Sequence, residues 1–297
     1  MSELITYWDY KHKAEEIENV ISEIPSARLV NIETQEGASN PKHFKAVVLT
    51  EKSGDRIVAT VSKKYKLVQH KDAFKPIIDG LHNTATEYDF SLIQTDIKAT
   101  LDVFVDEIDN SGLGGIRLGF RAISSIDGRN AIKYTMQQDR FKGSIELVGY
   151  RQVCENGMKI RVPLDQAEFV KPEIKGEITR LLEMSTNISH IGEVEEKIKA
   201  TQYVVEAMAL LKDPVRRIIE KARNKEVGDK EAKKLIGKYI GKRLAIRIAG
   251  HFYQHEEPSI WGLYNAITFV ASHGVSVSTM NGLLEKSATL LEKEITA

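Results

Sequence analysis

Residues 115–161 read GIRLGFRAISSIDGRNAIKYTMQQDRFKGSIELVGYRQVCENGMKIR. Residues 116–124 and 131–137 have the β-branched, alternating composition of strands, and Asp127 with Gly128 between them is a strong hairpin signal. Residues 144–153 fit a further strand or a short helix, and the AsnGly pair that follows suits a turn or a helix cap. The stretch therefore predicts the middle of an antiparallel sheet.

Weaker patterns on the N-terminal side predict two further strand pairs. Apolar runs within 45–61 surround a turn at 52–55 and predict one strand pair. Residues 88–93 and 97–105 predict a second pair. Apolar and polar residues alternate at 97–105, which predicts a strand that buries only one of its faces.

Helical patterns precede and follow these strands. A helical lead is expected over 1–24, and an amphipathic helix over 70–82, where Pro76 is awkward unless it lies in the first turn. From 172 onward the chain has helical spacing, with a break expected at Asp213–Pro214 and one helix from 229 to about 252. The pattern as a whole predicts an α+β fold. A curved antiparallel β-sheet with a hairpin and a packed helix occupies 1–170, and a helical C-terminal region, 171–297, packs on it.

Composition sets limits on where the protein works. The chain has 297 residues, 42 basic and 42 acidic side chains, and one cysteine, Cys154. A single cysteine forms no intramolecular disulfide, and no apolar run has the roughly 18 residues of a membrane span. The N-terminus lacks the order of a signal peptide. We therefore expect a soluble cytoplasmic protein, in which any nucleic-acid site depends on local segregation of charge.

Charge is segregated in the central stretch. Residues 115–161 contain nine basic and four acidic side chains, with aromatic residues between them, whereas 86–110 contain seven acids and one lysine. Arg117 and Arg121 are on alternate positions of a strand and so share one face. Basic side chains beside rings suit a phosphate backbone with stackable bases. The predicted nucleic-acid-binding residues are Arg117, Arg121, Lys133, Tyr134, Arg140, Phe141, Lys142 and Arg151. A solvent-facing sheet with scattered cations is the open alternative.

A second basic segment lies in the helical half. Residues 212–250 contain thirteen basic and five acidic side chains, and Lys230, Lys234 and Lys238 are four apart on one helical face. Such a face is either solvated or follows a phosphate backbone, and the sequence does not separate the two.

Motifs for catalysis, metals or cofactors are incomplete. Asp106, Glu107 and Asp109 lack the ligand order of an EF-hand, and GLGG at 112–115 is not a phosphate-binding GxGxxG loop. Cys154 has no base nearby in the sequence, and the His251–His255 pair lacks the glutamate of HExxH. We predict no catalytic residue, no metal and no cofactor, and hence a protein that is not an enzyme.

Three stretches in order, KYKLVQHKDAF at 64–74, VCENGMKI at 153–160 and WGLYNAITFVASH at 261–273, carry a family resemblance. They resemble the phage- and plasmid-associated family of unknown function numbered nine hundred and thirty-two. The order of elements is also similar to that of single-strand annealing recombinases, which form rings or filaments around single-stranded DNA. The resemblance implies a homo-oligomer that binds single-stranded DNA, with RNA an open alternative and no membrane as partner. Opposite charges of 86–110 and 115–161 would then pair between subunits.

Two other classes remain open at this point. One is a structural or assembly protein of a virus or plasmid that oligomerises through its helical half. The other is an enzyme such as a nuclease, although the acids at 102–109 form no convincing site.

Overall fold

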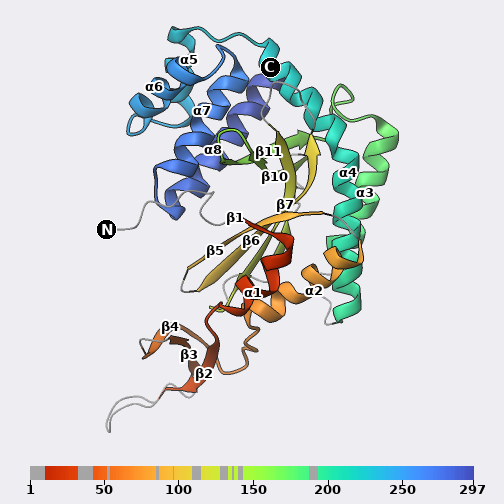
Figure 1. The fold of residues 1–297 in the computed structure, drawn as a ribbon, viewed down its shortest axis with the longest axis vertical. Coiled ribbons are helices and arrows are strands. Elements are labelled where there is room, and N and C mark those ends of the chain that lie inside the picture. The colour runs from red at the N-terminus through yellow and green to blue at the C-terminus, as the bar shows by residue number, and fades with distance from the viewer. Residues whose placement is uncertain are drawn as a thin grey trace.

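The computed structural model describes residues 11–32, 43–51, 54–84, 87–95, 97–108, 115–127, 133–135, 137–139, 143–186 and 193–297. They form an α+β fold with antiparallel sheets and with helices concentrated in the C-terminal half, as the sequence predicts (Figure 1). Within those ranges, no helix combines the length and the apolar composition needed to cross a lipid bilayer.

The central sheet is built from antiparallel neighbours. Its order is β1 (Lys11–Lys13), β5 (Asp89–Gln94), β6 (Lys98–Ile108), β7 (Ile116–Ser125), β10 (Ser144–Arg151) and β11 (Asn156–Pro163). Two short strands lie off this path, β8 (Lys133–Thr135) beside β7 and β9 (Gln137–Asp139) beside β10. The predicted hairpin of β7 and β8 is confirmed, and the segment after it is a strand, not a short helix.

The sheet divides near its middle. β7 pairs with β10 only where Ile116–Gly119 faces Val148–Arg151. Beyond this point β7 pairs with β8 and β10 pairs with β9, so the two long strands no longer share hydrogen bonds.

A second, three-stranded sheet lies at the end of the molecule opposite the C-terminal helices (Figure 1). It consists of β2 (Ala27–Asn31), β3 (Phe44–Glu51) and β4 (Gly54–Ser62), in that order and antiparallel. Val47, Leu49 and Val61 bury one face of this sheet together with Ile126. The small sheet therefore has its own core beside the main one.

The helices in chain order are α1 (Ile17–Ser22), α2 (His70–Asn83), α3 (Pro172–Thr186), α4 (Val194–Asn224), α5 (Asp229–Tyr239), α6 (Ala245–His255), α7 (Ile260–His273) and α8 (Val277–Thr296). The expected helical lead is present in part: a short 3-10 turn at Ala14–Glu16 and α1 are helical, whereas the described residues before them form β1. α2 confirms the amphipathic helix, with Pro76 beyond its first turn.

Two helix boundaries differ from the prediction. α4 continues through Pro214, which is buried, together with its apolar neighbour Val215. A proline removes one backbone hydrogen bond, and packing along the whole of this long helix compensates for that loss. Conversely, the single helix expected over 229–252 is two helices, because Gly241 has φ +96°, a left-handed conformation that ends α5.

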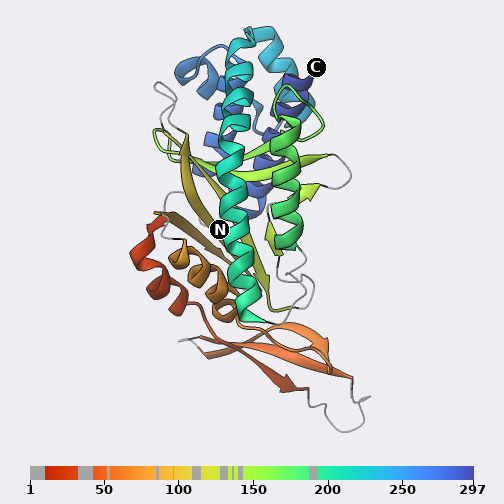
Figure 2. The same cartoon turned by 90° about the vertical axis from the view of Figure 1, so that its right-hand side faces the viewer.

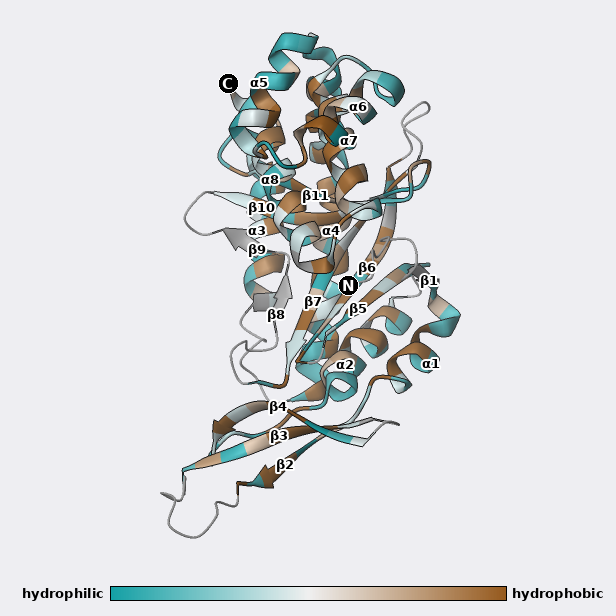
Figure 3. Ribbon diagram, turned by 90° about the vertical axis from the view of Figure 1, so that its left-hand side faces the viewer, coloured by the Kyte–Doolittle hydropathy of each residue, from teal (hydrophilic) through white to brown (hydrophobic). Residues whose placement is uncertain are grey.

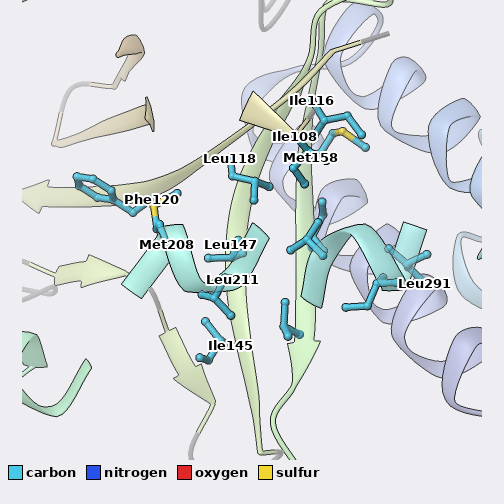
Figure 4. Packing of buried hydrophobic residues seen from close by; sticks show 14 of the residues in the cluster. Ile108, Ile116, Leu118, Phe120, Ile145, Leu147, Met158, Met208, Leu211 and Leu291 are labelled. Atoms are coloured by element: carbon cyan, nitrogen blue, oxygen red, sulfur yellow. The ribbon is translucent and has the colours of Figure 1, made fainter. Parts of the chain in front are cut away.

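Helices cover both faces of the central sheet. On one face, Met208 and Leu211 of α4 pack on Leu118, Phe120 and Leu147 (Figure 4), and α3 lies beside α4 (Figure 2). On the opposite face, Met280, Leu283 and Leu284 of α8 pack with Phe104, Val148 and Tyr150. The strand expected over 97–105 is present as β6, but the prediction that it buries only one face is wrong, because both of its faces are buried.

Candidate functional site on the charged face of the central sheet

Arg117 and Arg121 do share a face, as the strand period requires, but this is the face covered by α8. Arg121 donates from Nε to Asp102 Oδ1 at 2.6 Å and from Nη2 to Asp102 Oδ2 at 2.7 Å. Arg121 is 7% exposed and Asp102 0% exposed. The two residues face each other across β6 and β7, so the pair is a two-pronged ion pair inside the sheet.

Arg117 is also paired with a residue of the acidic segment, but through a single hydrogen bond. Its Nη1 donates to Asp89 Oδ2 at 3.0 Å, and its Nη2 donates to the carbonyl oxygen of Phe104 at 3.2 Å. Lys13 of β1 also lies 2.9 Å from Asp89. The expected pairing of opposite charges between subunits is thus wrong for these residues, whose partners belong to the same chain.

Arg151 connects the sheet to the helical half. Its Nη1 lies 3.2 Å from Oε1 and 3.3 Å from Oε2 of Glu256, the residue that caps the C-terminal end of α6. Burial raises the pKa of Glu256, and Arg151 opposes this rise by stabilising the carboxylate. Arg151 and Glu256 are 105 positions apart, and local sequence patterns do not predict contacts at such a separation.

For the other five predicted site residues the structure gives at most the course of the backbone. Lys133 and Tyr134 belong to β8, whose backbone pairs with Ile123 and Ala122 of β7. Arg140, Phe141 and Lys142 lie outside the described residues. For Arg117, Arg121 and Arg151, burial and internal pairing argue against a role as open phosphate ligands.

A second charge cluster, absent from the prediction, lies between β10, β11 and α8. Glu146 Oε1 is 2.7 Å from Lys159 Nζ, and Glu146 Oε2 is 3.2 Å from Arg161 Nε. Both cations also bond to Glu285 of α8. Burial alone would raise the pKa of Glu146, but Lys159 and Arg161 hold it below its usual value. The cluster therefore joins two cations to two carboxylates, Glu146 of β10 and Glu285 of α8.

A cavity opens on this charged face where the sheet divides. It has a volume of about 180 Å³ and is lined by Lys98, Arg121, Ile123, Glu146, Val148, Lys159 and Asn281. A neighbouring cavity of about 170 Å³ shares Lys98 and Asn281 and reaches the start of α8. Among the predicted site residues, Arg121 is the one that lines the first cavity.

The second basic segment of the sequence forms an exposed surface at the far end of the molecule, where α5 is predominantly hydrophilic (Figure 3). We call it the α5–α6 surface; its exposed basic residues are Lys230, Lys233, Lys234, Lys238, Lys242, Arg243 and Arg247. Lys238 lies 3.4 Å from Glu294, and Arg247 donates to the carbonyl oxygen of Gly274 at 3.0 Å. The other five have no carboxylate at ion-pair distance within the described part of the chain.

Apolar side chains adjoin this surface. Ile246, next to Arg247, is 89% exposed, and Tyr253 of α6 is also exposed while its hydroxyl donates to the Asp229 carbonyl oxygen at 3.1 Å. The Tyr253 ring is therefore held in place by its own hydrogen bond. Exposed aromatic rings on a basic surface are the groups on which single-stranded bases stack in nucleic-acid-binding proteins.

The histidines near α6 are arranged for packing. The ring of His251 stacks on that of Phe269, with 3.9 Å between the ring centroids, and the Phe269 ring stacks on that of His273 with 4.3 Å between centroids. The centroid of the His255 ring lies 4.9 Å from that of His251. Burial lowers the pKa of His251 to about 4, and the neighbouring histidines add to the effect. Among the described residues, no group of three or more His, Cys, Asp or Glu side chains is placed to hold a metal ion.

Cys154 lies in the turn between β10 and β11 and is half-buried. Burial raises the pKa of its thiol, and Arg151 only partly offsets this. A thiol with a raised pKa is a poor nucleophile at neutral pH, so the geometry does not favour covalent catalysis here.

Comparison with known proteins gives no relative from which to infer a role. No family model matches the chain, and neither a curated protein nor a solved structure is significantly similar to it. The resemblance to the phage and plasmid family, and the likeness to annealing recombinases, stay expectations from the sequence.

Proposed function

We propose that the protein binds single-stranded nucleic acid through its phosphate backbone, with the α5–α6 surface as the contact region. One observation carries the proposal: the seven basic side chains of this surface are exposed, whereas the central arginines are paired inside the molecule. An exposed cation releases counterions from a phosphate backbone when it binds, and a buried cation with its own carboxylate does not.

The finer part of the proposal is strand annealing during recombination of a mobile element. Annealing requires that a protein hold a strand by its phosphates and leave the base edges accessible to a complementary strand. A lysine-rich surface contacts phosphates as point charges and reads no base edges. We expect DNA as the ligand, and RNA of equal length is the comparison.

The test is a titration of a labelled 30-nucleotide oligothymidine at several salt concentrations, followed by fluorescence anisotropy. The logarithm of the binding constant should fall with the logarithm of the salt concentration by about 0.7 per phosphate neutralised on a single strand. Reversing Lys234, Lys238 and Arg243 to Glu should weaken binding more than tenfold and reduce that slope by about 2.

The matched control reverses three exposed lysines elsewhere, Lys71 of α2 together with Lys171 and Lys175 at the start of α3. It changes net charge by the same amount, so binding should stay close to that of the wild-type protein. If both triple variants lose affinity equally, net charge and not the α5–α6 surface explains the binding. If the wild-type protein does not bind at low salt, the proposal is wrong.

A second candidate, assembly into a homo-oligomer, is favoured by the small sheet. Ile57 of β4 is 69% exposed and Phe44 of β3 is 51% exposed, and the strand register places both on one face. Exposed large apolar side chains on one sheet face mark an interaction surface. Light scattering of the wild-type protein and of Ile57→Lys tests this: a smaller particle in the variant supports assembly through the small sheet.

A further inference from the structure

Ile246 is the most exposed large apolar side chain of the described chain, and the binding of phosphates gives it no role. It is 89% exposed and lies within four positions of Lys242, Arg243 and Arg247, which are also exposed. The chain between positions 229 and 255 contains seven basic and two acidic residues. Ile246 is therefore an apolar projection surrounded by positive charge.

A groove between α1 and α2 has the opposite arrangement. It has a volume of about 260 Å³. Ile21 and Ile78, each 4% exposed, lie at its base, and the carboxylates of Glu18, Asp72 and Asp79 lie around them. The groove is therefore an apolar recess with carboxylates at its rim.

The groove region is negatively charged although Lys71 and Lys75 also line the groove. Lys75 is already paired, with 3.5 Å between its Nζ and a carboxylate oxygen four residues further along α2. Residues 14–23, beside the groove, contain four exposed glutamates and no basic residue. Within the described part of the chain, Glu18 and Asp72 have no cation at ion-pair distance. Their carboxylates are therefore accessible to a cation from outside the chain.

We propose that Ile246 of one copy of the chain occupies the α1–α2 groove of a second copy. The cations beside Ile246 then face the carboxylates at the rim, so the contact is complementary in both shape and charge. An apolar residue that enters a pocket elsewhere on an identical molecule makes a heterologous contact, in which each copy uses a different surface. α5 and α6 lie near the end of the molecule that holds the C-terminus, whereas α1 and α2 lie toward the small sheet (Figures 1 and 3), so one copy does not close this contact within itself.

This contact goes beyond the proposed nucleic-acid function and does not depend on it, because both partners are protein. It shares the α5–α6 surface with the proposed nucleic acid, so the measurements use protein free of nucleic acid. Because few side chains take part, the contact is small and association should depend on protein concentration. Because the charges are exposed, association should weaken as the chloride concentration rises.

The test is sedimentation velocity of the full chain over a range of protein concentrations at low and high chloride. The wild-type protein should form species larger than a monomer at low salt. Ile246→Asp removes the apolar projection and should weaken association about tenfold or more. Val153→Asp makes the same kind of change at a 69% exposed position between β10 and β11, and should leave association unchanged.

A second variant tests the groove. Glu18→Lys with Asp72→Lys reverses two exposed charges at the rim and should also weaken association about tenfold or more. The matched control, Glu173→Lys with Glu220→Lys, changes net charge equally at exposed positions of α3 and α4 and should associate as the wild type does. Unchanged melting temperatures show that the variants are folded.

A mixture of the two weakened variants distinguishes this contact from a symmetric one. Ile246→Asp keeps an intact groove, and the groove variant keeps Ile246. The mixture therefore has one intact contact and should form a dimer that grows no further, although each variant alone stays monomeric. The series is repeated in the Ile57→Lys background, where assembly through the small sheet does not contribute.

Several outcomes overturn the proposal. They are a wild-type protein that stays monomeric at low salt, association of Ile246→Asp equal to that of the wild type, or a mixture that stays monomeric. Equal losses in the groove variant and its matched control would mean that net charge, and not the groove, governs association. Association that is lost entirely with Ile57→Lys would place the contact on the small sheet instead.

Discussion

Arg121 of β7 holds Asp102 of β6 with two parallel hydrogen bonds of 2.6 and 2.7 Å, in a place where Asp102 is fully buried and Arg121 is only 7% exposed. A bidentate pair of this kind satisfies both charges at once. Removing one partner leaves the other buried without compensation, which is far more costly than removing both.

The first prediction concerns this pair. Arg121→Met should destabilise the protein by about 3–5 kcal/mol, because Asp102 is then buried without its partner. The double variant Arg121→Met, Asp102→Leu should recover most of that loss, since no buried charge remains. Urea denaturation of the two variants measures the difference. A single variant that loses less than about 1 kcal/mol would show that water reaches Asp102 in the folded protein.

The second prediction is a pH dependence that originates at His70. Its Nδ1 lies 2.9 Å from Ser124 Oγ, and burial lowers its pKa from 6.5 to about 4. Between these two values the unfolded chain binds a proton that the folded protein excludes, so stability falls as the pH decreases from 6.5 to about 4 and then levels off. His251 has the same direction of shift and contributes to the same window.

The measurement is the urea midpoint at several pH values for the wild-type protein and for His70→Gln. The variant should lose part of the decline between pH 6.5 and 4, because glutamine does not titrate. His43→Gln, at an exposed position, serves as the control and should keep the full decline. Parallel curves for wild type and His70→Gln would contradict the assignment.

The third prediction concerns Gly119, at the point where the sheet divides. A Cβ atom at this position would lie 1.9 Å from the carbonyl oxygen of Val103, so Gly119→Ala forces the two strands apart. We expect a loss of stability of at least about 2 kcal/mol. Gly176 of α3 has open space around its Cβ position, and Gly176→Ala should stabilise the protein by about 0.5–1 kcal/mol. Equal effects of the two substitutions would disprove the close approach of the strands.

The fourth prediction concerns Arg151 and Glu256. Burial already raises the pKa of Glu256 above 4.5, and loss of Arg151 should raise it further. When the pKa of a carboxyl group is higher in the folded than in the unfolded protein, the free energy of unfolding falls as the pH rises from the unfolded pKa to the folded one. Arg151→Met should therefore be more destabilising at pH 7.5 than at pH 5, as measured by urea denaturation. A cost that is independent of pH would mean that Glu256 is hydrated in the variant.

Local patterns predicted the elements well where one period dominates. The β7–β8 hairpin and α2 follow from residue types within about ten positions, and both are present. Pro214 shows the limit of such reasoning: a strong local helix breaker lies inside α4, because packing on the sheet holds the helix on both sides of it. Gly241 is the opposite case, in which one residue in the left-handed region ends a helix that the apolar spacing would continue.

For the site, the sequence by itself determined that Arg117 and Arg121 share one face of a strand, because side chains alternate with a period of two. Only the tertiary structure decided which side that face turns to. α8, about 160 residues further along the chain, covers it, and Asp89, Asp102 and Glu256 neutralise arginines that the sequence shows only as a cationic run. Charge in a sequence is local, whereas burial depends on which distant element packs above it. The lysines of α5 remain exposed for the same reason, because no helix of the described chain packs over them.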